Sequence, residues 1–187
     1  MLLLWGLFST AGTAQISEKR LTPIPDLGTS LYQGIQGGLY PGGENTHPLL
    51  KEGIACAKKI HPRATDGDID LVNGKVVWLS IGMSNTTQET RIFLKLMRFY
   101  EKKNAYLSMI DGAFGAQDIN KINSSTSPYW DQVIQRLGQA GLSAKQVQVI
   151  WFKEAEAAPK DTAFSSYTQA LKEKYMIFAI GIIKEIF

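Results

Sequence analysis

One stretch constrains the fold of this chain more than any other, residues 75–89, where an apolar run ends at a glycine and a helix pattern begins. The run from Val76 to Ile81 is apolar at nearly every position and rich in β-branched and aromatic residues, which is typical of a strand buried on both faces of a parallel sheet. Asn85 and Thr86 are good helix N-caps, and Thr86 with Glu89 fits a capping box. The stretch therefore predicts a buried strand, a turn and a helix.

The same order of elements follows twice more along the chain. Two further strands are predicted by the apolar runs Ala105–Ile110 and Val147–Phe152. Helices are predicted over 86–103, from Pro128 to a glycine at 138 or 141, and from about Phe164 to the end. Because alternating strands and helices with short connections form right-handed βαβ units, we expect an α/β fold of the flavodoxin-like kind, with a narrow parallel sheet between two helix layers.

The first of these helices carries an apolar stripe. Its members recur at the spacing of one helical turn and predict a face directed at the core: Ile92, Leu96, Phe99 and Tyr100.

Residues 1–14 have the pattern of a signal peptide. The apolar run Met1–Phe8 is followed by small residues ending at Ala14, which suit cleavage, although no basic residue precedes the run. The run is too short to span a bilayer, and its alternative is a buried N-terminal strand or helix. The pattern predicts a secreted or periplasmic protein.

Residues 15–70 are rich in glycine and proline and predict a loop-rich N-terminal arm with a short helix at Leu49–Lys59, followed by an α/β domain over 71–187. The arm carries polar and aromatic side chains that suit either contact with a sugar or simple packing: Tyr32, Gln33, Gln36, Tyr40 and Asn45.

Composition excludes several classes of function. The net charge of +3 is small and the basic residues are scattered among acidic ones, so we expect no nucleic-acid partner. The single Cys56 cannot form an internal disulfide and is predicted to be a buried, small apolar residue. Aspartates alternate over 66–70, but no glutamate closes a calcium loop, so we expect a polar turn there and no metal or cofactor.

Candidate chemistry gathers where the three predicted strands end. Ser84 follows the first strand, the glycine-rich turn Gly112–Gly115 follows the second, and Glu154 and Glu156 follow the third. The carboxyl ends of parallel strands meet at one edge of a sheet, which is where such folds bind ligands. A serine nucleophile with backbone N–H donors is what acyl transfer requires, although a serine that simply caps the helix is the alternative.

Three segments resemble the SGNH (GDSL-like) hydrolase superfamily, and in particular a group of exported bacterial SGNH-like proteins: residues 79–89, 110–117 and 128–131. The similarity runs from Asp26 to the end of the chain. The resemblance implies that Ser84 is the nucleophile and that Gly115, or Ala116 after a shift of one residue, supplies a second oxyanion donor. Glu156 falls near the place of the family's third-block asparagine.

The chain departs from that family at two points. A carboxylate at Glu156 cannot donate to an oxyanion unless it is protonated. The family's final Asp-x-x-His is missing, since His47 and His61 both precede prolines. We therefore expect a C-terminally incomplete ester hydrolase for acyl or acetyl esters of small molecules or carbohydrates, inactive as printed because nothing activates the serine. The alternatives are a non-catalytic carbohydrate-binding or surface protein that retains the fold, and an unstable fragment without function.

Overall fold

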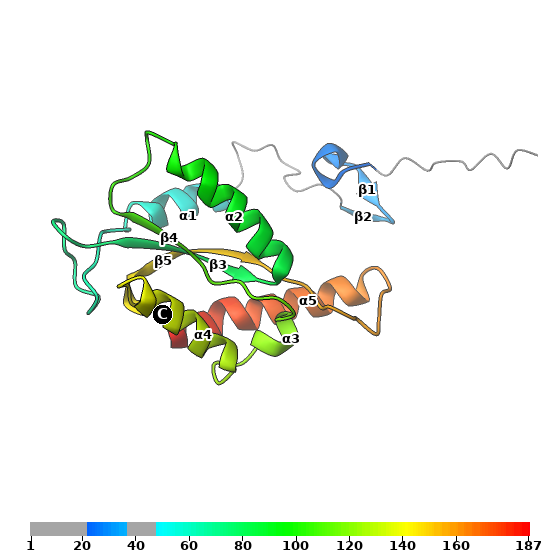
Figure 1. The fold of residues 1–187 in the computed structure, drawn as a ribbon. Helices are drawn as coiled ribbons and strands as arrows, with labels where there is room; N and C mark the ends of the chain where they lie inside the picture. The colour runs from blue at the N-terminus through cyan, green and yellow to red at the C-terminus, as the bar shows by residue number, and fades with distance from the viewer. Residues whose placement is uncertain (1–21, 37–47) are drawn as a thin grey trace, which may run out of the picture. The chain divides into compact units, whose positions relative to one another are not determined.

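The computed structural model of the protein describes residues 22–36 and 48–187 (Figure 1). The chain divides into two compact units, Met1–Cys56 and Ala57–Phe187, and each is described by itself. The predicted signal peptide, together with Tyr40 and Asn45 of the arm, lies outside the described residues.

The first unit is built from short elements. A single 3-10 turn at Ile24–Leu27 precedes a small antiparallel hairpin of β1 (Leu31–Tyr32) and β2 (Ile35–Gln36). Gln33 and Gly34 between these strands both have positive φ angles, as a two-residue hairpin turn requires. The sequence predicted only loop here, because strands of two residues leave no period to detect.

Helix α1 (Pro48–Ala57) confirms the predicted short helix. Cys56, near its end, is exposed, so the expectation of a buried cysteine is wrong. Free cysteine is usually buried, so the residue type gives no sign that this position near the helix end is exposed.

The second unit contains the predicted parallel sheet. Its strands are β3 (Val76–Gly82), β4 (Leu107–Asp111) and β5 (Val147–Lys153), in the spatial order β4-β3-β5. Helix α2 (Ser84–Arg98) connects β3 to β4. Since β3 lies in the middle, the chain moves first to one side of it and then crosses to the other, which places successive crossover helices on opposite faces.

The opposite face of the sheet carries the helices that follow β4 and β5 (Figure 1). Helices α3 (Ile119–Ile122) and α4 (Pro128–Gln139) connect β4 to β5, and α5 (Ser166–Ile177) follows β5. The three-layer α/β arrangement expected from the sequence is confirmed.

The core of this unit lies between β3 and the helices of that second layer. Val77, Leu79 and Ile81 of β3 are buried in one cluster with side chains of α4, such as Trp130. The chain ends in a π-helical turn, Phe178–Ile182, and α6 (Ile183–Ile186). Phe178 and Ile182 are buried in the same cluster, so this part of the apolar helix packs inside.

A polar turn precedes β3, as predicted. Asp70 Oδ1 accepts hydrogen bonds from the backbone N–H groups of Val72 and Asn73. The backbone of Arg63 forms antiparallel β-bridges with Ile69 and with Lys75. These bonds tie residues 62–75 to the start of the sheet, so the second unit begins before the boundary at residue 70 that the sequence suggested.

The predicted core-facing stripe of α2 is wrong. Its members are 56%, 65%, 85% and 53% exposed, in the order Ile92, Leu96, Phe99, Tyr100. The face of α2 that meets the sheet instead buries Thr86 and Thr90. Because threonine is small, these residues let the helix lie close to the sheet. Because threonine is also partly polar, they do not appear as an apolar periodicity in the sequence.

Candidate functional site

The turn between β3 and α2 presents Ser84 at the carboxyl edge of the sheet. Ser84 is the first residue of α2 and is exposed. A β-carbon on Gly82 would lie 2.2 Å from Thr86 Oγ1 and 2.3 Å from the carbonyl oxygen of Lys153, so only glycine fits between β5 and the helix start. This close approach brings α2 down onto the end of the sheet directly after β3.

The predicted capping box is not present. The N-cap position is Met83, whose side chain makes no capping hydrogen bond, and in the first turn Asn85 Oδ1 accepts from Thr86 N at 2.9 Å. Thr86 lies inside the helix and its Oγ1 donates to the Lys153 carbonyl at 3.0 Å, while Glu89 pairs with Lys153 Nζ. These two side chains secure α2 to β5. The N–H groups of Ser84 and Asn85, the first two residues of α2, have no partner within the helix.

The loop after β4 is fixed against this turn by several hydrogen bonds. Phe114 N donates to the Gly82 carbonyl at 3.0 Å, and Thr87 Oγ1 donates to the Ala113 carbonyl at 3.1 Å. From the other layer, the Tyr129 hydroxyl donates to the Gly112 carbonyl at 2.8 Å. The guanidinium of Arg136 donates to the carbonyls of Asp111 and Ala113 and stacks 3.8 Å above the Phe114 ring. The loop is therefore held in one position.

Two of the predicted site residues are neighbours. A β-carbon on Gly115 would lie 4.0 Å from the β-carbon of Ser84, with no other atom nearer. Gly115 is exposed, and Ala116 after it has a φ of 60°, which turns the chain sharply. The strand-end placement expected from the sequence therefore brings Ser84 and Gly115 together.

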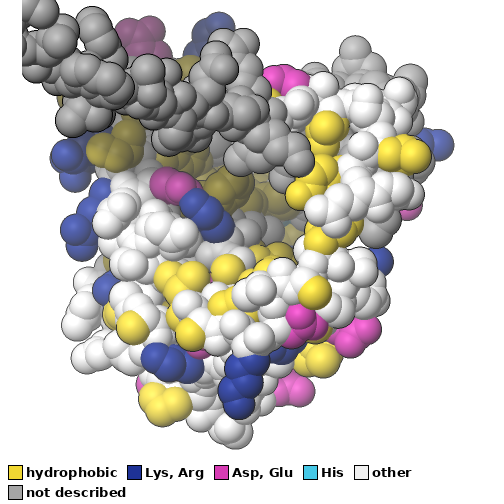
Figure 2. All heavy atoms as spheres, turned by 90° about the vertical axis from the view of Figure 1, so that its right-hand side faces the viewer, with side chains coloured by type: hydrophobic (Ala, Val, Ile, Leu, Met, Phe, Trp, Pro, Cys, Tyr) yellow, Lys and Arg dark blue, Asp and Glu magenta, His cyan; other side chains and the backbone are white. Residues whose placement is uncertain are grey.

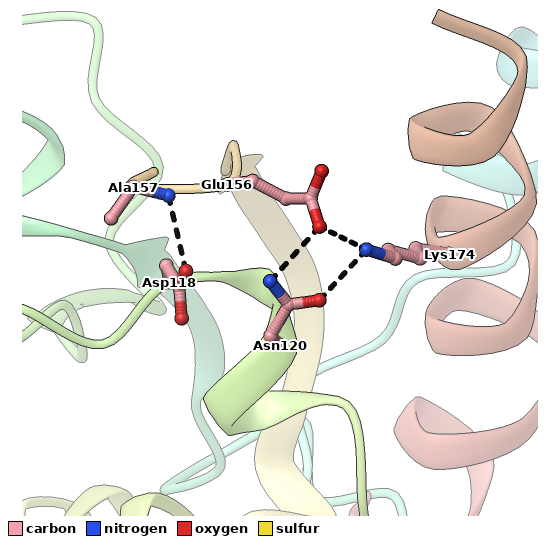
Figure 3. A network of polar contacts seen from close by, with 5 residues as sticks. All are labelled: Asp118, Asn120, Glu156, Ala157 and Lys174. Carbon is pink, nitrogen blue, oxygen red and sulfur yellow. Dashed lines mark hydrogen bonds and ion pairs between the residues drawn. The ribbon is translucent and has the colours of Figure 1, made fainter. Parts of the chain in front are cut away.

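Glu156 has a different set of contacts. Its carboxylate accepts hydrogen bonds from Asn120 Nδ2 at 3.0 Å and from Lys174 Nζ, as Figure 3 shows. Lys174 also donates to Asn120 Oδ1 at 2.8 Å, which closes a triangle between α3, α5 and the loop after β5. The hydrogen bond from Lys174 lowers the pKa of Glu156, with Asn120 acting in the same direction. An ionised carboxylate only accepts hydrogen bonds, so Glu156 cannot serve as an oxyanion donor.

Glu154 is the carboxyl group that stays protonated. It is only 6% exposed, its Oε1 is buried without a hydrogen-bond partner among the described residues, and its Oε2 accepts from Ala155 N. The pKa of Glu154 is raised to about 8, mainly by burial; the Ala155 N–H bond opposes the shift and the nearby charge of Asp118 adds to it. At neutral pH this side chain is therefore mostly a neutral acid.

Sequence reasoning placed Glu154 and Glu156 at one strand end without separating them. It missed Asp118, Asn120 and Lys174 entirely. Asp118 Oδ2 accepts from Ala157 N at 3.1 Å and joins the two loops (Figure 3). Strand alternation places residues i and i+2 on the same face, so it does not separate the buried Glu154 from Glu156. Nothing in the sequence signals Lys174 either, because it lies on a helix distant along the chain.

A polar cleft of about 360 Å³ lies beside this triangle. Its lining includes both charges and hydroxyl groups: Asn120, Glu156, Lys160, Asp161, Tyr167 and Lys174. Groups of this kind hydrogen-bond to polyhydroxylated or charged molecules.

Neither of the two histidines is found beside Ser84 in the described part of the chain. The backbone of His61 exchanges hydrogen bonds with the side chain of Gln148, near the amino end of β5 and hence at the opposite edge of the sheet. Figure 2, which faces the side where the strands end, shows no histidine among the described residues visible there. His47 lies outside the described residues.

Within residues 22–36 and 48–187, no group of three or more histidine, cysteine, aspartate or glutamate side chains is arranged to hold a metal ion. The helices found there are all too short or too polar to cross a bilayer.

The fold and this edge together define an α/β protein with a three-stranded parallel sheet and an exposed serine at the strand-to-helix turn of its central strand. Comparison of the chain with protein-family models, with curated proteins and with solved structures finds no match.

Proposed function

We propose that this chain is an ester hydrolase domain of the SGNH type, in which Ser84 is the nucleophile. The observation that carries the proposal is the pairing of Ser84 with the Gly115 loop at the end of the central strand. Ser84 is exposed at the first position of α2, where backbone N–H groups have no partner within the helix. Backbone donors of this kind stabilise the oxyanion of an acyl-transfer intermediate.

The catalytic base of this proposal comes from outside the described residues. A serine hydroxyl without a base stays protonated and reacts slowly, so the described residues alone support only weak reactivity. We further propose that the substrate is an acyl or acetyl ester with a polar alcohol part, such as a carbohydrate, because the cleft beside Glu156 is lined by hydrogen-bonding groups. Residues 1–14 support export of the protein to the periplasm or medium.

Labelling of Ser84 with a fluorophosphonate tests the proposal. We expect slow labelling that increases several-fold when imidazole is added, because Ser84 is exposed and a small external base can reach it. Ser84→Ala should abolish labelling. The matched control is Ser166→Ala, since Ser166 is also the exposed first residue of a helix, and it should leave labelling unchanged. A folded protein that is not labelled with or without imidazole refutes the nucleophile.

A second candidate is a non-catalytic carbohydrate-binding protein. The ionised Glu156, held by Lys174 and Asn120 at the polar cleft, favours it, because this arrangement binds hydroxyl groups without any need for a nucleophile. In this case oligosaccharide binding measured by calorimetry would survive Ser84→Ala and weaken in Asn120→Ala. The esterase proposal expects Ser84→Ala to remove the reaction whatever happens to binding.

A further inference from the structure

Two parallel rows of side chains run along the outside of α2. The apolar row is formed by Ile92, Leu96 and Phe99, and the basic row by Arg91, Lys95 and Arg98. Both rows have the i, i+4, i+7 spacing, and each basic residue precedes its apolar neighbour by one position. Successive residues of a helix are about 100° apart, so the basic row flanks the apolar row along its whole length. All six side chains are exposed.

The apolar row continues onto the sheet. Phe93 packs on Trp78 with ring centroids 5.6 Å apart, and both side chains line a hollow of about 290 Å³ together with Trp151 of β5. Trp151 is 49% exposed. We call this surface the α2 apolar face and define it by its exposed large side chains: Ile92, Phe93, Leu96, Phe99, Tyr100 and Trp151.

The charge next to the α2 apolar face is positive. Residues 84–103 contain five basic residues, Arg91, Lys95, Arg98, Lys102 and Lys103, against two acidic ones, Glu89 and Glu101. Glu89 is paired with Lys153 from β5, which leaves the surplus of positive charge intact. Positive charge is thus locally concentrated on α2 and on the turn that follows it.

We propose that the α2 apolar face docks on the surface of an anionic lipid bilayer. An amphipathic helix with apolar and aromatic side chains on one face and basic residues on its flank lies in the plane of the interface, where the apolar side chains enter the acyl boundary and the basic ones meet the head groups. Aromatic side chains favour this boundary, and Phe93, Phe99 and Trp151 lie on the face itself. The ester hydrolase proposal does not require this surface, and the two are independent.

Charge argues against a second copy of the chain as the occupant. A two-fold interface brings the same patch of both subunits together, and where the two α2 helices run antiparallel the basic rows lie on the same side and repel. An anionic bilayer complements the basic row directly, with an attraction that falls when salt screens it.

Vesicle co-sedimentation of the full chain tests the proposal. We expect binding to vesicles of equal parts phosphatidylcholine and phosphatidylglycerol, little binding to phosphatidylcholine alone, and weaker binding in high salt. Lys95→Gln with Arg98→Gln should weaken binding roughly 30-fold, because each basic residue near an anionic surface contributes on the order of a fivefold change in affinity. Leu96→Ser with Phe99→Ser should weaken it at least tenfold by removing inserted apolar area.

Matched controls lie on the other helix layer. Met176→Ser with Ile177→Ser changes exposed apolar side chains of α5, and Lys172→Gln with Lys184→Gln removes two exposed positive charges; both pairs should bind as the unaltered chain does. Equal losses in the controls, or no binding to anionic vesicles, overturn the proposal. Sedimentation velocity completes the test. If the chain does not bind vesicles but forms a dimer, and Leu96→Ser with Phe99→Ser dissociates that dimer, the occupant of the face is a second copy.

Discussion

Ser84 and Gly115 lie side by side although they come from two different strand-to-helix loops, with only 4.0 Å between the β-carbon of Ser84 and the place of a β-carbon on Gly115. The loop that carries Gly115 is secured by hydrogen bonds to Gly82, Thr87 and Tyr129. The distance between Ser84 and Gly115 is therefore set by the fold, and it limits the size of the side chain that position 115 can carry beside the serine.

Substitutions at Gly115 should change how easily a reagent reaches Ser84 without changing the stability of the fold. Gly115→Ala fits at ordinary contact distance and should leave labelling unchanged, whereas Gly115→Leu extends its side chain toward Ser84 and should slow fluorophosphonate labelling about tenfold or more. Because Gly115 is exposed, the free energy of unfolding should change by no more than about 0.5 kcal/mol in either variant. Equal labelling rates for the two variants, measured on folded protein, would show that the reagent does not pass Gly115.

The strands and their parallel order were predictable because their signal is local. Val76–Ile81 and Val147–Phe152 are continuous apolar runs, and short connections to helices leave few topologies open. The direction of the α2 stripe was not predictable, since an apolar row at helical spacing looks the same whether it faces this sheet or something outside the chain. Thr86 and Thr90, which do face the sheet, carry no apolar signal.

The candidate site was predictable only at positions that come within a few residues of the end of a strand. Ser84 and Gly115 follow β3 and β4 closely, so the sheet fixes their position. Lys174, the partner that sets the charge of Glu156, comes from the last turn of α5, and its approach depends on how that helix packs. Which of the two glutamates is buried depends on the same packing, and this decides their opposite pKa shifts.

Gly82→Ala should be strongly destabilising. The added carbon would overlap the backbone carbonyl of Lys153 and the short side chain of Thr86, so α2 must move away from β5. We expect a loss of about 2–4 kcal/mol in the free energy of unfolding, measured by urea titration. A loss below about 1 kcal/mol would mean that the turn relaxes easily and that Ser84 is not rigidly held.

Gly138→Ala should have the opposite effect. Gly138 lies in the last turn of α4, and a β-carbon there meets nothing within 4 Å. Replacing an unstrained helix glycine with alanine reduces the entropy of the unfolded chain, so the free energy of unfolding should rise by about 0.5–1 kcal/mol. The same urea titration measures it, and a decrease would indicate that the space above Gly138 is occupied in solution.

Glu154 should make the protein less stable as pH rises from about 5 to about 8. Its pKa is about 8 in the folded chain, because the side chain is buried, against 4.5 for an ordinary glutamate. In that window the unfolded state has lost the proton that the folded state keeps, so each rise in pH favours unfolding, by on the order of 1 kcal/mol per pH unit. Glu154→Gln keeps the shape without the ionisation and should flatten this slope, whereas Glu101→Gln, at an exposed position, should not. Urea titrations at several pH values measure the slope, and an unchanged slope in Glu154→Gln would show that Glu154 is already ionised at neutral pH.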